Sequence, residues 1–82
     1  MKLPRDLGGL ELAELLRRYG YEVSRQTGSH LRLVSHLRGS EHHVTIPAHD
    51  SLKVGTLSAI LMEVSSYLEI TRADLDRELF GS

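Results

Sequence analysis

Leucines recur at helical spacing near the start of the chain. Leu12, Leu15, Leu16 and Tyr19 are three or four residues apart, which predicts a helix over residues 10–19 with one buried side. Gly20 follows directly, and glycine is a common residue just past the end of a helix. We therefore expect the helix to stop there.

A two-residue alternation of apolar and polar positions replaces the helical spacing after Gly20. It covers residues 21–26 and 30–37, separated by a Thr-Gly-Ser turn, and predicts two strands of a hairpin. The side chains expected on the buried side are those of Tyr21, Val23, Leu31, Leu33 and Leu37. The opposite side of the second strand carries His30, Arg32, Val34, His36 and Arg38. That side is either a cationic functional surface or the ordinary solvated side of an antiparallel sheet.

A third strand is expected over residues 42–46. Val44 and Ile46 would point inward and His43 and Thr45 outward, and Pro47 would end the strand because proline cannot donate to a sheet. The three strands predict an antiparallel meander with one apolar face.

The longest helical pattern follows a polar loop. Ser51 is a candidate N-cap for a helix that starts near Leu52 or Lys53. Its apolar stripe is Val54, Leu57, Ile60, Leu61, Val64 and Leu68. Lys53 in the first turn would oppose the helix dipole. It is therefore either a functional residue or simply an exposed lysine with little energetic cost.

A short helix is expected at the end of the chain. Thr71 is a candidate N-cap with Asp74 three residues later, and apolar residues follow within residues 72–80. The predicted fold class is α+β: a helix, a three-stranded antiparallel meander, a long helix and a short C-terminal helix. The helices should cover one face of the sheet and leave the other open.

Length and composition agree with one small domain over residues 1–82. The absence of cysteine excludes disulfides and thiolate metal sites. No apolar run reaches the roughly 18 residues of a membrane span and no signal peptide is evident, so we expect a cytoplasmic protein without membrane contact. The net charge of −1 hides a balance of +2 in residues 1–55 and −3 in residues 56–82. A local cationic site is compatible with that distribution.

The candidate chemistry centres on the turn before the second strand. His30 is the first residue after the turn, and Arg25 lies five residues upstream. RNA carries its own nucleophile, the 2′-hydroxyl, so a protein needs only a group to take that proton and cations to stabilise the phosphate. Histidine, with an unperturbed pKa of about 6.5, suits the proton transfer. Such a reaction needs neither a metal nor a cofactor.

Metal binding is the alternative that five histidines raise. His42 and His43 are adjacent, so they would point to opposite faces of a strand. His30 and His43 could meet across strands, but no carboxylate at a recognisable spacing completes a site. The sequence also contains no nucleophile-elbow or phosphate-loop motif. We therefore expect no metal site.

Three blocks of the sequence together resemble the HicA (YcfA-like) toxins, the small mRNA interferases of bacterial and archaeal toxin–antitoxin pairs. The resemblance spans roughly residues 8–68. The blocks are Gly20-Tyr21 with Arg25-Gln26-Thr27-Gly28-Ser29-His30, then Val44-Thr45-Ile46-Pro47 with His49, then Leu52-Lys53 with Gly55-Thr56-Leu57 and Ile60-Leu61.

The resemblance implies a double-stranded-RNA-binding-domain-like fold and metal-free cleavage of mRNA, with His30 as the catalytic residue. It implies a HicB-type antitoxin that masks this histidine. We expect no contact with DNA from this chain alone. Gly28 and Ser29 match the turn that positions His30, and Lys53 matches a frequently basic position. We further expect Arg25 and Arg32 near the phosphate.

The sequence departs from the family pattern at two places, and two other functions are also compatible with it. Leu31 follows the motif histidine where many members have a second histidine or another polar residue. Residues 72–80 extend beyond the smallest members and would cap the core or contact the antitoxin. The alternatives are a non-catalytic RNA-binding module of the same fold and an interaction protein without an RNA role. Whether His43 or His49 assists His30 is also open.

Overall fold

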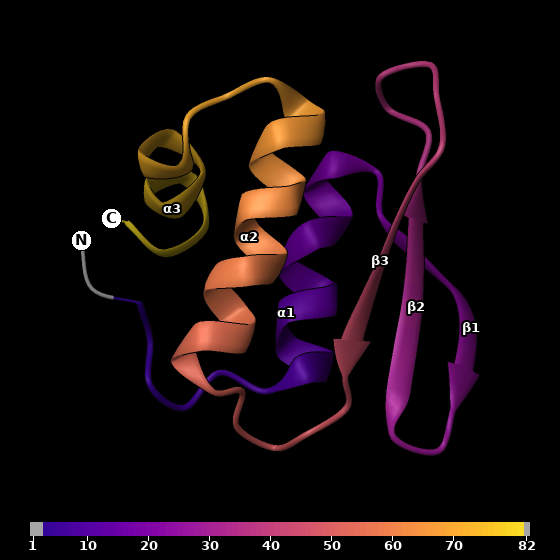
Figure 1. Cartoon of the computed structure of the whole chain (residues 1–82), viewed down its shortest axis with the longest axis vertical. Coiled ribbons are helices and arrows are strands. Elements are labelled where there is room, and N and C mark those ends of the chain that lie inside the picture. The colour runs from indigo at the N-terminus through magenta and orange to yellow at the C-terminus, as the bar shows by residue number, and fades with distance from the viewer. Residues whose placement is uncertain (1–2, 82) are drawn as a thin grey trace.

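The computed structural model describes residues 3–81, so residues 1, 2 and 82 of the expected domain lie outside the described residues. Helices and strands follow in the predicted order (Figure 1). The elements are α1 (Gly9–Leu16), the 3₁₀ turn η1 (Arg17–Tyr19), β1 (Glu22–Thr27), β2 (His30–Ser35), β3 (His42–Pro47), α2 (Val54–Leu68) and α3 (Arg72–Phe80). This α+β order agrees with a double-stranded-RNA-binding-domain-like fold.

The three strands form one antiparallel sheet in the order β1-β2-β3, with β2 in the middle. Figure 1 shows α1 and α2 together on one side of this sheet, with α3 packed against α2 on the side away from it. The inward side chains of β2 and β3 are fully or almost fully buried beneath the helices: Leu31, Leu33, Val44 and Ile46. The side chains that alternate with them are exposed or half-buried. One face of the sheet is therefore open, as predicted.

Helix α1 confirms the expected helix over residues 10–19, with its last turn tightened into η1. At its start the Glu11 carboxylate accepts a hydrogen bond from the Gly8 N–H at 2.8 Å. At its end Gly20 has a φ of 82°, a left-handed conformation that glycine adopts at no steric cost. Leu12 and Leu16 are completely buried against the sheet. The chain can then turn directly into β1.

Two residues expected in the core are exposed. Val23 is 48% exposed on β1, a strand that the helices leave uncovered along its length, and Leu37 is 59% exposed because β2 ends at Ser35. Ser35 takes the last inward position of β2 instead and is completely buried. Its hydroxyl donates to the Tyr19 carbonyl at 2.7 Å and accepts from the Leu37 N–H at 3.2 Å. These two bonds satisfy a polar side chain that would otherwise be costly to bury.

The start of α2 differs from the sequence prediction. Ser51 is not the N-cap, because its hydroxyl donates to the Arg5 carbonyl at 3.0 Å. Lys53 occupies the N-cap position without a side-chain cap, and Val54 is 56% exposed. The rest of the predicted stripe is buried from Leu57 to Leu68. The helix is correctly predicted, but it begins one or two residues later than expected.

Helix α3 begins as predicted. The Thr71 hydroxyl accepts a hydrogen bond from the Asp74 N–H at 3.0 Å, which satisfies one of the free donors at the helix start. Leu75 and Leu79 are buried against the rest of the core. Within residues 3–81, no helix has the length and apolar character needed to cross a bilayer.

Candidate active site

A shallow hollow of about 250 Å³ lies on the open face of the sheet. All three strands contribute to it: Arg25, Thr27, His30, Arg32 and Thr45. Three of these side chains are ones that the sequence singled out as candidates for RNA chemistry. The structure therefore brings His30 together with the two arginines that were expected beside it.

The strand register explains this grouping. Thr27 pairs with His30, Arg25 pairs with Arg32, and Arg32 also pairs with Thr45 on its other side. Directly paired residues on antiparallel strands present their side chains on the same face. His30 and Arg32 are two residues apart on β2 and so share that face as well. The hollow is thus a consequence of backbone pairing.

A bulge at Ser24 is needed to turn Arg25 to this face. Val23 pairs with Leu33, whose side chain is in the core, so strict alternation would also place Arg25 on the core side. The register shifts between Val23 and Arg25, and Arg25 then pairs with Arg32. The Ser24 hydroxyl donates to the Arg32 carbonyl at 3.2 Å at this point. Bulges commonly re-aim a side chain in this way.

The structure gives the two arginines in the hollow no neutralising partner among the described residues. Other arginines form ion pairs with carboxylates, among them Arg38 with Glu69 at 2.6 Å and Arg72 with Asp76 at 3.0 Å. Among residues 3–81, no carboxylate lies within ion-pair distance of Arg25 or Arg32. Like charges directly opposite on neighbouring strands destabilise a sheet. This arrangement favours an anion, such as a phosphate, between the guanidinium groups.

His30 is held at the start of β2 by its neighbours. The Ser29 hydroxyl lies 3.1 Å from Nδ1 of the His30 ring. The Ser29 carbonyl in turn accepts from the Ala48 N–H at 2.8 Å, which fixes the turn to the residue after β3. When Nδ1 carries the proton and donates to Ser29, Nε2 is left as the free base. The ring is exposed and can be reached from solvent.

Gly28 has neither of the two features that usually require a glycine in a turn, a left-handed backbone conformation or a close backbone approach. Among the described residues only Gly20, Gly39 and Glu69 have positive φ, so Gly28 does not need a left-handed conformation. A Cβ built on Gly28 would meet no atom within 4 Å, so there is no close backbone approach either. The fold therefore does not require glycine at this position.

The other candidate residues lie outside the hollow. Lys53 is the exposed N-cap of α2 and does not line it. His43 pairs with Val34 whereas His30 pairs with Pro47, so the two histidines do not face each other across the strands. His49 lies in the loop after β3, where its carbonyl accepts from the Gly9 N–H at 2.9 Å. The part of the chain that the structure describes contains no group of three potential metal ligands.

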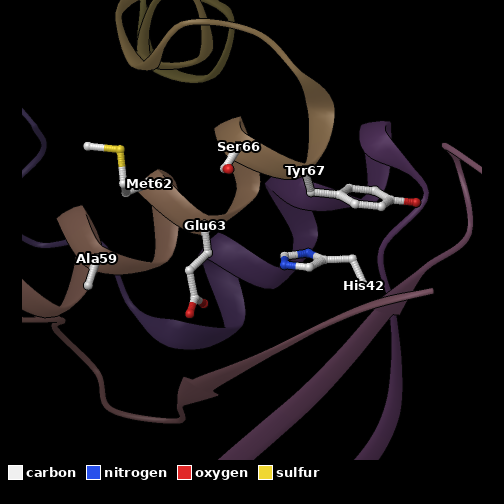
Figure 2. Close-up of a pocket in the computed structure, with 6 residues that line it drawn as sticks. All are labelled: His42, Ala59, Met62, Glu63, Ser66 and Tyr67. Carbon is white, nitrogen blue, oxygen red and sulfur yellow. The ribbon is translucent and has the colours of Figure 1, made fainter. Parts of the chain in front are cut away.

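Sequence reasoning missed Thr27 and Thr45 as members of the hollow. The alternation did place Thr45 outward, but only the register shows that it faces Arg32. Reasoning also missed a second histidine site between β3 and α2, shown in Figure 2. There His42 is partly buried because it alternates with the outward-facing His43, and burial lowers its pKa. The adjacent pair of histidines could have indicated this.

Comparison with known families gives one match. A family described as the HicA toxin of bacterial toxin–antitoxin systems matches residues 9–65, which is more than half of the chain. The matched stretch runs from the start of α1 into α2 and includes the whole sheet. No curated protein and no solved structure matches the chain significantly.

Proposed function

The chain belongs to the HicA toxin family of bacterial toxin–antitoxin systems, and on this premise we propose that it is an endoribonuclease that cleaves mRNA with His30 as its catalytic residue. The observation that carries the proposal is the hollow on the open face of the sheet. It combines an accessible imidazole with two guanidinium groups that lack carboxylate partners among the described residues.

The proposed reaction uses the RNA's own 2′-hydroxyl. Nε2 of His30 takes the proton of this hydroxyl, and the 2′-oxygen forms a bond to the adjacent phosphorus. The bond from phosphorus to the 5′-oxygen of the next nucleotide breaks, and water supplies the proton that this oxygen needs. The products are a 2′,3′-cyclic phosphate and a free 5′-hydroxyl. The step requires no metal or cofactor because the nucleophile is already next to the phosphorus.

The remaining candidate residues have supporting roles in this proposal. Arg25 and Arg32 hold the phosphate and stabilise the charge that develops on it. Ser29 orients the His30 ring through its hydroxyl, and Gly28 keeps the turn free of side-chain atoms where RNA approaches. Lys53 contacts the RNA backbone outside the hollow.

We propose a HicB-type antitoxin as the protein partner. Family membership implies a toxin–antitoxin pairing. An antitoxin that covers the open face would block access to His30. Because the substrate would be mRNA, the proposed place of action is the cytoplasm.

An RNA cleavage assay in excess EDTA tests the enzymatic proposal. The purified protein should cut single-stranded RNA, and His30→Ala should not, while its circular dichroism spectrum and unfolding curve remain those of the parent. His36→Ala is a matched control, because this exposed histidine lies beyond the end of β2 and outside the hollow. It should cut RNA at the parental rate.

Two results would overturn the proposal. Equal RNA binding without cleavage by both the parent and His30→Ala would favour the second candidate, a non-catalytic RNA-binding module that uses the same two arginines. Cleavage that EDTA abolishes would point to a metal-dependent reaction instead.

A further inference from the structure

A second hollow, of about 610 Å³, lies on the helical side of the molecule between the start of β3 and the outer surface of α2. It is lined by His42, Ala59, Met62, Glu63, Ser66 and Tyr67. Figure 2 shows the nitrogen-bearing edge of the His42 ring turned toward the side of the hollow where Glu63 lies. None of these six residues belongs to the hollow around His30.

The hydrogen bonds of His42 determine what its ring offers to a ligand. The Tyr21 hydroxyl lies 2.6 Å from Nδ1 of His42. The Tyr21 hydroxyl keeps its proton, since burial raises the pKa of this tyrosine, and it can donate that proton to Nδ1. Nδ1 then acts as the acceptor and the neutral ring carries its hydrogen on Nε2. Nε2 has no hydrogen-bond partner among residues 3–81, so it is a free donor.

The His42 ring is fixed in place by aromatic contacts. It stacks on Tyr67 with a centroid distance of 4.7 Å and an interplanar angle of 10°. The Tyr67 hydroxyl is already engaged, since it donates to the Ser40 carbonyl at 2.7 Å and accepts from the Arg38 N–H at 2.9 Å. In Figure 2 this hydroxyl points away from Glu63. The hollow therefore presents a rigid aromatic wall.

Glu63 supplies a negative charge opposite this wall. Its carboxylate forms no ion pair with any cation in the described part of the chain, and its side chain is exposed. Met62, which is 55% exposed, and Ala59 add apolar surface beside it. A carboxylate at this position repels the phosphates of RNA, so the hollow suits a cationic group of a protein.

We propose that this hollow binds an arginine side chain presented by a protein partner. The guanidinium would pair with the Glu63 carboxylate, where its planar group can form two parallel hydrogen bonds. Its methylene groups would lie along Met62 and Ala59. The backbone carbonyl of the same residue would accept from Nε2 of His42. Arginine matches the charge, the apolar surface and the free donor together.

The test uses capped arginine (N-acetyl-L-arginine methylamide) added to the ¹⁵N-labelled protein, with amide shifts followed by NMR. We expect saturable shifts concentrated at Ala59, Glu63, Ser66 and His42. Capped citrulline, which has the same shape without the charge, should bind at least fivefold more weakly. Agmatine, which keeps the guanidinium but lacks the backbone carbonyl, should also bind more weakly than capped arginine.

Glu63→Gln is the decisive variant because it removes only the charge from an exposed side chain. It should abolish the preference for capped arginine over capped citrulline. Glu22→Gln, which changes an exposed glutamate on β1 outside this hollow, should leave the preference unchanged.

Equal binding of both capped residues by the parent would overturn the proposal. Concentration-dependent shifts of the same amides without ligand would also overturn it, by assigning the hollow to a second copy of this chain. Neither outcome depends on whether the protein cleaves RNA.

Discussion

Arg25 and Arg32 lie directly opposite each other on β1 and β2, on the open face of the sheet. Like charges directly opposite each other tend to destabilise a sheet, and in the proposed function a bound phosphate would offset this repulsion. The pairing of Arg25 with Arg32 also depends on the bulge at Ser24. A like-charge pair and a β-bulge therefore occur at the same place in the sheet. Local rules broken together are a common sign of a functional site.

Replacing either arginine should lower the rate of RNA cleavage without lowering the stability of the fold. Arg32→Gln is expected to slow RNA cleavage about 100-fold, because a cation that stabilises the phosphate is lost. The free energy of unfolding should stay unchanged or rise by a few tenths of a kcal/mol, since a like-charge repulsion is removed. Cleavage rates and urea unfolding measure the two effects. Arg17→Gln, at an exposed arginine 3.9 Å from Glu14, should change neither. A large loss of stability in Arg32→Gln would contradict this account.

Ser29 should act by positioning His30. The hydrogen bond between its hydroxyl and Nδ1 is exposed, and bonds of this kind contribute about 0.5–1.5 kcal/mol. Ser29→Ala is therefore expected to lower the cleavage rate about three- to tenfold while RNA affinity stays the same. Ser29→Thr retains a hydroxyl and should restore most of the rate. Single-turnover cleavage and RNA titrations distinguish the two quantities. Failure of threonine to rescue the rate would argue against a positioning role.

Replacement by alanine should destabilise the protein at Gly9 and have little effect at Gly28. A Cβ on Gly9 would collide with the Pro47 carbonyl oxygen, in a part of α1 held by the bond from the Gly9 N–H to the His49 carbonyl. Gly9→Ala should therefore lower the free energy of unfolding by about 1–3 kcal/mol. Gly28→Ala meets open space and should stay within about 0.5 kcal/mol of the parent. Urea unfolding of both variants checks this. An unfolded Gly28→Ala variant would contradict the conclusion that the turn does not require glycine at this position.

His42 should make stability depend on pH in mildly acidic solution. Burial lowers the pKa of His42 in the folded state, whereas unfolded histidine titrates near pH 6.5. Between these two values the unfolded chain binds more protons, so stability falls as the pH drops below about 6.5. Above that pH the contribution of the neutral ring is fully present. Glu63 opposes the shift by favouring the charged ring, and His43 adds to it.

His42→Gln tests this pH dependence. The difference in unfolding free energy between pH 7.5 and pH 5.5 should be smaller in this variant than in the parent. His49→Gln, at an exposed loop histidine, should show the parental difference. The same difference in all three proteins would assign the acid sensitivity to other groups.

Most elements of the fold could be predicted from the spacing of apolar residues. Burial in the core requires apolar side chains, and it therefore leaves a pattern in the sequence. Two such patterns are the stripe from Leu57 to Leu68 and the alternation in Leu31, Leu33, Val44 and Ile46. Ends of elements were less predictable because they depend on tertiary partners. Ser51 has the composition of an N-cap, but its hydroxyl is taken by the Arg5 carbonyl, 46 residues earlier in the chain.

The sequence predicted three of the residues that line the hollow, Arg25, His30 and Arg32, but only part of its geometry. His30 and Arg32 follow from alternation along β2. Arg25 reaches the same face only through the bulge at Ser24, and serine is too common in strands and turns to indicate a bulge by itself. Ser35 shows the same limit, since its burial depends on the distant Tyr19 carbonyl.

The separation of the sheet into a packed side and an open side also affects how copies of this gene can diverge. Selection for a folded product acts on the residues beneath the helices and leaves the exposed positions around His30 free to drift. A copy that has lost the His30 imidazole would still fold and would keep the surface of α2 unchanged. In a cell that holds both copies, the inactive product would compete with the active one for a partner recognised through α2. Gene duplication could in this way produce a natural antagonist of the active protein.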